Sequence, residues 1–209
     1  ELVANTFPEL GRPLSSSAPF YVLAEFASGH GGDLRSGTER WLEEAAERGL
    51  VTDGTIAADE KQSSVLWEIR HRATEAMKKD GAPCAKCDIS VPIGAVPDFL
   101  TTADEAMLAM EPGARIIAFG HLGDGNIHYD ILAPKDGDHE AFRHRMKHLE
   151  GRVHDIAVGF GGSFSAEHGI GQLKRDELAQ RKDPVELSMM RMIKAGLDPK
   201  GLMNPGKLL

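Results

Sequence analysis

One short stretch limits the folds open to this chain more than any other: FGHLGDGNIHYDIL, from Phe119 to Leu132. An apolar run that ends at His121 is followed by Asp124-Gly125 and then by a second strand-like run. Asp-Gly is favoured in two-residue type I′ hairpin turns, because both central residues need positive φ there. Such a turn would place His121 directly opposite His128 on one face of two antiparallel strands. The fold is therefore expected to contain an antiparallel pair that carries two imidazoles.

The remaining elements follow from apolar spacing and from Gly and Pro breaks. Besides the hairpin, whose first strand is Arg115–His121, strands are expected at Phe20–Ser28, Lys86–Val91 and around Phe164. Helices are expected at about Gly37–Arg48, Glu60–Lys79, Pro97–Met110, His139–Gly159 and Pro184–Ala195, and the Gly- and Pro-containing tail after them is not expected to be helical. Strands that alternate with helices and include one hairpin predict an α+β sandwich, with a mixed or mostly antiparallel sheet and helices on one face.

Composition narrows the class of protein. A chain of 209 residues with 41% hydrophobic content can bury a sizeable core as one domain or two small ones. The net charge is −8 and no Lys/Arg run could follow a phosphate backbone, so nucleic acid is not expected as a partner. Without a run of roughly 20 apolar residues or a signal-peptide pattern, a cytoplasmic location without a transmembrane segment is expected. A homodimer is left open.

Two histidines alone would fit a packed or solvated imidazole pair as well as a metal site. Asp130 lies two residues beyond His128, on the same strand face, and could join or orient such a site. A catalytic metal site needs a third protein ligand and an open position. Glu167 and His168, between glycines in GGSFSAEHGIG, are the best candidates, with Glu167 as ligand and His168 as general base.

Several other groups have metal-like residue types but are predicted to be structural. On the long helix, Glu140, His144 and His148 recur every four residues with basic residues between them, which indicates a solvated helix face. The single C-x-x-C has no second pair to complete a four-cysteine zinc site, and two reduced thiols in a loop are expected. The two cysteines are Cys84 and Cys87. His30, which lies among glycines, and His71, on the exposed side of its helix, are also predicted to be structural.

Five blocks occur in an order and spacing that resemble a known family: FYVLAEFAS, LWEIRHRATEAM, HLGDGNIHYDI, SAEHGIGQLK and LDPKGLMNPGKLL. The chain resembles the C-terminal domain of FAD-linked oxidases, a family that includes D-lactate dehydrogenases, glycolate oxidase and D-2-hydroxyglutarate dehydrogenase. The resemblance implies a ferredoxin-like substrate domain over FAD that is held mainly by a separate N-terminal domain. It divides the chain into a lead-in from that domain, residues 1–18, and the substrate domain, residues 19–209.

The resemblance also implies roles for individual residues. It implies a divalent metal, with zinc preferred, on His121, His128 and Glu167, and His168 as the base. Substrate carboxylates would meet Arg70, Thr74 and Lys86, and the tail residues Asn204 and Lys207 would return toward the flavin. Asp130 stands where close relatives often carry Asn, so substrate preference is expected to differ here.

The expected activity is oxidation of a D-2-hydroxy acid to a 2-oxo acid, with hydride transfer to FAD. The chain alone, without the FAD-binding domain of its parent protein, is expected to be inactive. Two alternatives stay open. One is a metal-binding module that binds hydroxy acids without turnover, and the other is a metal-dependent hydrolase in which His168 activates water.

Overall fold

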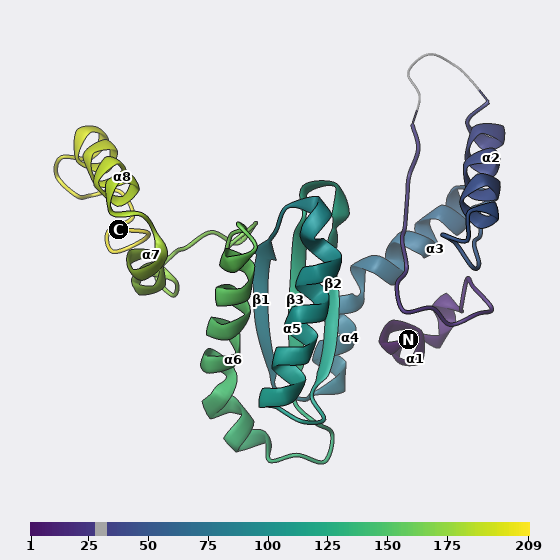
Figure 1. Ribbon diagram of the computed structural model, residues 1–209, viewed down its shortest axis with the longest axis horizontal. Coiled ribbons are helices and arrows are strands. Elements are labelled where there is room, and N and C mark those ends of the chain that lie inside the picture. Colours follow the sequence, from purple (N-terminus) through teal and green to yellow (C-terminus); the bar gives the residue numbers. More distant parts are fainter. Residues whose placement is uncertain (28–32) are drawn as a thin grey trace. The chain divides into compact units, whose positions relative to one another are not determined.

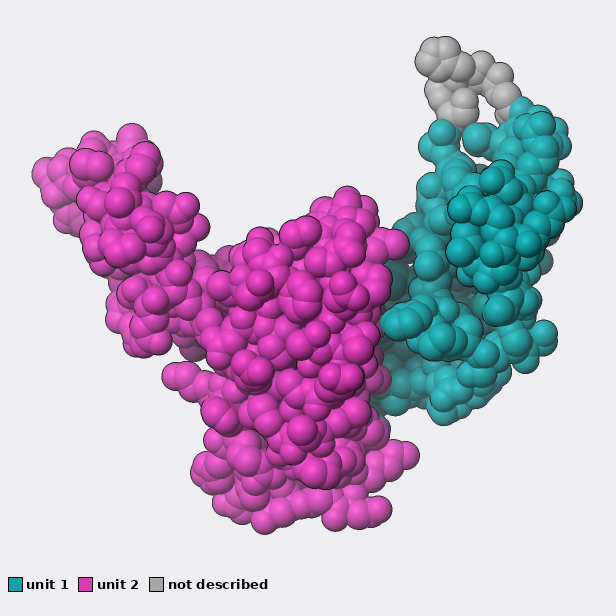
Figure 2. All heavy atoms as spheres, in the orientation of Figure 1, with its two compact units in different colours: residues 1–81 teal, residues 82–209 magenta. Residues whose placement is uncertain are grey.

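A computed structural model describes residues 1–27 and 33–209. The chain forms two compact units, Glu1–Gly81 and Ala82–Leu209, which Figure 2 shows in separate colours. We call them unit 1 and unit 2 and describe each by itself.

Unit 1 is helical in its described part. Its elements are α1 (Leu2–Thr6), a 3₁₀ turn η1 (Pro8–Leu10), α2 (Leu34–Glu47), α3 (Glu60–His71) and α4 (Ala73–Asp80). Two of the helices begin after an aspartate whose side chain accepts an N-terminal backbone N–H, Asp33 in α2 and Asp59 in α3. The helix expected over Glu60–Lys79 is interrupted at Arg72, where φ is −81° and ψ is 3°.

The strand expected at Phe20–Ser28 is not formed in residues 20–27, and Ser28 lies outside the described residues. Phe20 and Val22 are 70% and 75% exposed. A strand needs a neighbour to satisfy its N–H and C=O groups. All the paired strands of the described chain belong to unit 2, so β-forming composition alone was not sufficient.

Unit 2 is built on a three-stranded antiparallel sheet (Figure 1). Its strands are β1 (Cys84–Ser90), β2 (Arg115–His121) and β3 (Asn126–Leu132), in the order β1-β3-β2. The 3₁₀ turn η2 (Ile93–Ala95) and helix α5 (Val96–Met110) connect β1 to β2, and α6 (His139–Gly159) follows β3. The predicted α+β class and antiparallel sheet are confirmed.

Alternation along the strands separates a core face from a polar face. Side chains at odd positions of β1 and β3, such as Ile89 and Tyr129, are buried in the core with residues of α5 and α6. Even positions carry polar groups, and the register pairs Asp88 with His128 and Lys86 with Asp130. Helices α5 and α6 therefore cover the core face, while the polar face gathers the chemistry-bearing residues.

The hairpin register differs from the prediction by two residues. A 3₁₀ turn, η3 (Leu122–Asp124), lengthens the connection, so that His121 pairs with Asn126 and Phe119 with His128. The shift is even, so His121 and His128 still share one face, as diagonal neighbours. The Asp124 carboxylate accepts the Asn126 N–H at 3.1 Å, which stabilises the wider turn.

The chain after α6 runs beside the free edge of β1. Ser163 and Ser90 exchange two backbone hydrogen bonds, of 2.8 and 3.0 Å, in an isolated antiparallel bridge. A Cβ at Gly162 would lie 2.0 Å from the Ser90 carbonyl oxygen, so only glycine permits this approach. The strand expected around Phe164 is thus a single bridge, in the position of the fourth strand of a ferredoxin-like βαββαβ sheet.

The C-terminal part contains α7 (Arg175–Arg181), which was not predicted, and α8 (Pro184–Leu197). Phe164, Leu178 and Leu187 form a second, smaller apolar cluster there. The tail after α8 is not helical, as expected. Within residues 1–27 and 33–209, no helix has the length and apolar character to cross a membrane.

Candidate metal and substrate site

The polar face of the sheet places His128 between two carboxylates. Its Nδ1 lies 3.7 Å from Asp88 Oδ1, and its Nε2 lies 3.6 Å from Glu167 Oε2. Phe119, its partner on β2, lies against the ring with a centroid separation of 5.0 Å. The imidazole is 16% exposed, so its two nitrogens face different acids in a half-enclosed position.

Glu167 brings the two hairpin histidines together. Its Oε1 lies 4.0 Å from His121 Nε2, while its Oε2 faces His128. Glu167 is distant in sequence from the hairpin and reaches it through the segment that pairs with the edge of β1. Glu167 therefore faces both predicted histidine ligands, one with each of its oxygens.

Asp88 was not singled out from the sequence. Its Oδ2 accepts backbone N–H groups from Ala166, Glu167 and His168 at 3.2, 2.9 and 2.8 Å. Burial by itself would raise the pKa of Asp88, but these N–H groups and the nearby His168 ring outweigh it and lower the pKa. The sequence signal that could have identified Asp88 was an acidic residue on the polar face of the strand expected at Lys86–Val91.

His168 lies beside the same group. Its Nδ1 is 3.6 Å from Asp88 Oδ2, and its ring stacks on His128 with centroids 5.6 Å apart. Its side chain is 66% exposed. An accessible imidazole next to Asp88 and His128 is suited to exchange a proton with a bound molecule.

Imidazole and carboxylate groups are donors that suit a divalent cation. Ligand atoms roughly 2.0–2.2 Å from a tetrahedral zinc lie roughly 3.3–3.6 Å apart. Glu167 Oε2 has this separation from His128 Nε2, whereas Oε1 has a longer one, 4.0 Å, from His121 Nε2. Among the described residues, Asp88 Oδ1 and both side-chain polar atoms of Asn126 are buried without a hydrogen-bond partner. Such groups are rare in folded proteins and mark places where a ligand, ion or water completes the structure.

A second, overlapping set of donors is also close. In the part of the chain that the structure describes, one ligand atom each from Asp88, His128 and His168 lie within 4.8 Å of one another. Asp88 Oδ2 accepts three N–H groups, so Oδ1 is the oxygen that this group offers to a cation. The predicted set, Glu167 with both hairpin histidines, shares His128 with this group.

Lys86 and Asp130 form the next cross-strand pair along the polar face. Asp130 is 4% exposed, and burial raises its pKa to about 6, against the lowering effect of Lys86 and His168. The backbone N–H of Lys86 donates to Glu150 Oε1 of α6 at 3.3 Å. A buried acid and an exposed base thus extend the site along the sheet.

Four predicted substrate or cofactor residues lie elsewhere in the chain. Arg70 and Thr74 belong to α3 and α4 of unit 1, on either side of the interruption at Arg72. Asn204 and Lys207 lie in the exposed tail after α8, where the Lys207 N–H donates to the Asn204 carbonyl at 3.2 Å. Their roles stay predictions.

The other candidate groups have the structural character expected of them, with one exception. His71, His144 and His148 are exposed, and His30 lies outside the described residues. Cys84 and Cys87 are free thiols, but they lie in β1 and not in a loop. Burial raises the pKa of Cys84 to about 12 and that of Cys87 well above its usual value, so both stay protonated near neutral pH.

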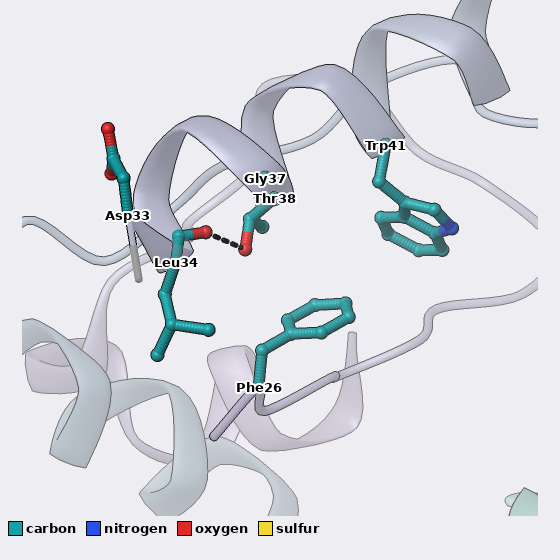
Figure 3. A pocket seen from close by; sticks show the side chains of 6 residues that line it. All are labelled: Phe26, Asp33, Leu34, Gly37, Thr38 and Trp41. Carbon is teal, nitrogen blue, oxygen red and sulfur yellow. Dashed lines mark hydrogen bonds between the residues drawn. The ribbon is translucent and has the colours of Figure 1, made fainter. Parts of the chain in front are cut away.

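A shallow pocket of about 270 Å³ lies in unit 1, away from these groups in sequence (Figure 3). The rings of Phe26 and Trp41 meet edge to face across it, with centroids 5.6 Å apart. Thr38 donates its hydroxyl to the Leu34 carbonyl, and Asp33 caps α2. Among the described residues that line the pocket, Asp33 and Thr38 thus use their side-chain oxygens in hydrogen bonds within α2 and its N-terminus.

Comparison with known proteins identifies the family of the chain. The sequence profile of FAD linked oxidases, C-terminal domain, matches residues 1–208. The chain belongs to this family. Among curated relatives, a mitochondrial D-2-hydroxyglutarate dehydrogenase of Bos taurus is 41% identical over 203 residues, which are 96% of this chain and 35% of the relative.

Two further members of the family extend the comparison. A D-2-hydroxyglutarate dehydrogenase of Stutzerimonas stutzeri is 37% identical over 94% of this chain and 42% of its own length. A mitochondrial protein of the same name from Arabidopsis thaliana is 37% identical over 100% of this chain and 36% of its own length. The chain therefore spans well under half the length of these relatives.

Proposed function

We propose that this chain is the substrate- and metal-binding domain of an FAD-dependent dehydrogenase that oxidises a D-2-hydroxy acid to a 2-oxo acid. The observation that carries the proposal is the position of Glu167, whose two oxygens face Nε2 atoms of His121 and His128. Family membership supports the flavin, held mainly by an FAD-binding domain of the same parent protein. The names of the relatives support a 2-hydroxy acid substrate.

His121, His128 and Glu167 would hold the divalent cation, and two imidazoles with one carboxylate are donors that suit zinc. Bound there, the cation would supply Lewis-acid polarisation of the substrate's α-hydroxyl group. The half-enclosed His128 and the exposed His121 leave the substrate side of the site open.

The proton of the α-hydroxyl group would pass to His168, and a bound flavin would supply the acceptor for the α-hydrogen as hydride. Because His168 Nδ1 faces Asp88, its Nε2 is the nitrogen that receives the proton. The planar guanidinium of Arg70 is suited to bind the substrate carboxylate through two N–H groups, with Thr74 as a further donor.

Lys86 and Asp130 set the substrate preference in this proposal. Lys86 attracts a second carboxylate, and Asp130 opposes it directly across the strands. Asn204 and Lys207 in the tail would contact the flavin. The cytoplasmic location stays a prediction, because relatives named as mitochondrial occur beside bacterial ones.

The test uses the parent protein, with its FAD-binding region, and the variant His121→Ala. Purified wild-type protein is expected to contain about one zinc ion per chain and to reduce a dye with at least one of a panel of D-2-hydroxy acids. Loss of a direct ligand is expected to lower kcat/KM more than about 100-fold, beyond the range of outer-shell changes. His144→Ala, which changes an exposed histidine of α6, serves as the matched control.

Full zinc occupancy in His121→Ala would refute the ligand set. Hydrolysis of esters or amides by the wild-type protein without flavin would contradict the dehydrogenase. Binding of hydroxy acids without dye reduction by any of them would favour a binding module.

A further inference from the structure

The segment that carries Glu167 and His168 has no regular secondary structure of its own. Ser163 attaches its start to the edge of β1, but Glu167 lies four residues further on. Two adjacent side chains with different tasks need a fixed backbone, because small errors in their placement weaken both binding and proton transfer. The carboxylate of Asp88 lies where it can fix this backbone, because it accepts the N–H groups of both residues.

Asp88 is 2% exposed, and one of its oxygens accepts all three N–H groups of residues 166–168. The Ala166 N–H also approaches the Asp88 backbone carbonyl at 3.2 Å. Hydrogen bonds to a carboxylate are roughly twice as strong as those between neutral groups. The loop is thereby tied to β1 through a buried charge.

The other oxygen of Asp88 faces the hairpin. Among the described residues, Oδ1 has no hydrogen-bond partner, and it lies 3.7 Å from His128 Nδ1. The opposite nitrogen of the same ring faces Glu167. Histidines that bind metals usually donate their second ring N–H to a carboxylate or carbonyl, which fixes the tautomer and the orientation of the ring.

We propose that Asp88 is a positioning residue for this site: one oxygen holds the Glu167–His168 segment on β1, and the other orients His128 so that its Nε2 faces Glu167. The proposal deepens the proposed metal site and rests on it in part. Asp88 is not itself a ligand in this arrangement. Its Oδ2 is occupied by three donors, and its Oδ1 lies on the Nδ1 side of His128, away from Glu167.

The first arm of the test needs no metal. In the metal-free 209-residue chain, amide hydrogen exchange at Glu167 and His168 is measured by NMR in wild type, Asp88→Asn and Asp104→Asn. Loss of the buried charge is expected to speed exchange at these two amides about 10- to 100-fold. Asp104 accepts the Tyr129 hydroxyl at 2.7 Å in the same unit, so Asp104→Asn controls for loss of a partly buried carboxylate. It is expected to leave both amides unchanged.

The second arm measures zinc affinity by competition with a chelator. Asp88→Asn is expected to bind zinc about 10- to 100-fold more weakly, with one ion per chain at saturation. The asparagine must keep its oxygen on the three N–H groups, so its NH₂ group would face His128 Nδ1 and favour the wrong tautomer for binding through Nε2. Asp104→Asn is expected to bind as wild type does.

Each outcome decides one of the two proposals. Unchanged exchange at Glu167 and His168 in Asp88→Asn would overturn the anchoring role. Loss of zinc with an undisturbed loop would make Asp88 a ligand and also overturn it. If wild type binds no zinc, the metal site fails, while the exchange arm still tests the anchor.

If Asp88→Asn does not fold, the ¹⁵N spectrum of the His128 ring in metal-free wild type decides the orientation. The Nδ1–H tautomer supports the proposal, and the Nε2–H tautomer contradicts it.

Discussion

The two faces of the unit 2 sheet have opposite character although the same strands supply both. On β3, Ile127, Tyr129 and Ile131 enter the core under α5 and α6, while Asn126, His128 and Asp130 lie on the polar face. Successive side chains of a strand point to opposite sides of the sheet, so core residues alternate with polar-face residues along β3.

The difference between the faces lies in how their polar groups are satisfied. The one polar atom of Tyr129 on the core face donates to Asp104 at 2.7 Å. On the polar face, Asp88 Oδ1 and the Asn126 amide are buried without partners among the described residues. The Tyr129 hydroxyl is thus satisfied within the protein, whereas these polar-face atoms are left for a ligand, ion or water.

The largest effect is expected from breaking the core face. Tyr129 is fully buried and packs edge to face on Phe99, with centroids 5.9 Å apart. Tyr129→Ala is expected to lower the free energy of unfolding by about 3–5 kcal/mol, measured by urea denaturation. Tyr129→Phe, which removes only the hydroxyl group, is expected to cost about 1 kcal/mol.

The neighbouring polar-face residue provides the contrast. His128→Ala is expected to abolish high-affinity zinc binding at a smaller stability cost than Tyr129→Ala. If Tyr129→Ala retained wild-type stability, the interpretation that the core face supplies stability and the polar face supplies binding would be wrong.

A medium effect is expected where the site segment joins the sheet. In Gly162→Ala the new methyl group would lie 2.0 Å from the Ser90 carbonyl oxygen, so the backbone must move. We expect a loss of about 1–3 kcal/mol in unfolding free energy and faster amide exchange at Ser163, whose N–H donates to Ser90. Gly159→Ala has open space around the new methyl group and is the matched control, expected to be neutral or slightly stabilising. Equal stability of the two variants would contradict the close approach.

Sequence patterns correctly predicted those helices and strands whose local residue preferences agree with their packing in the fold. Helix α6 has the predicted bounds, His139–Gly159, and β2 has the bounds predicted for the first strand of the hairpin. The pattern failed at Phe20–Ser28, where β-forming residues have no strand to pair with in the described part of the chain. It also missed the break at Arg72, which splits one periodic helix into two.

The sequence correctly predicted which hairpin residues share a face, because the alternation of side chains along a strand decides this. The hairpin register was wrong by two residues, yet both histidines stay on one face because an even shift preserves the face. Asp88 could not be assigned its role from sequence, because that role depends on backbone N–H groups of residues 166–168. Those groups come close only when the segment after α6 lies along β1.

The smallest effect concerns a buried polar group of α6, His154, whose ring lies against Phe164 of the smaller apolar cluster. The ring is 4% exposed, and its Nδ1 lies 2.7 Å from Glu177 Oε1. Burial lowers the pKa of His154, with Lys174 and Arg181 acting in the same direction and Glu177 opposing them. The folded state therefore binds this proton less readily than the unfolded state, whose histidine titrates near 6.5.

Stability from this group is consequently complete above about pH 6.5 and is lost as the pH falls below that value, by at most about 1.4 kcal/mol per pH unit. We expect urea unfolding between pH 7.5 and 5.5 to show a shallower loss in His154→Gln than in wild type. His148→Gln, an exposed change on the same helix, is expected to keep the wild-type slope. Equal slopes in wild type and His154→Gln would mean that the acid sensitivity in this range does not come from His154.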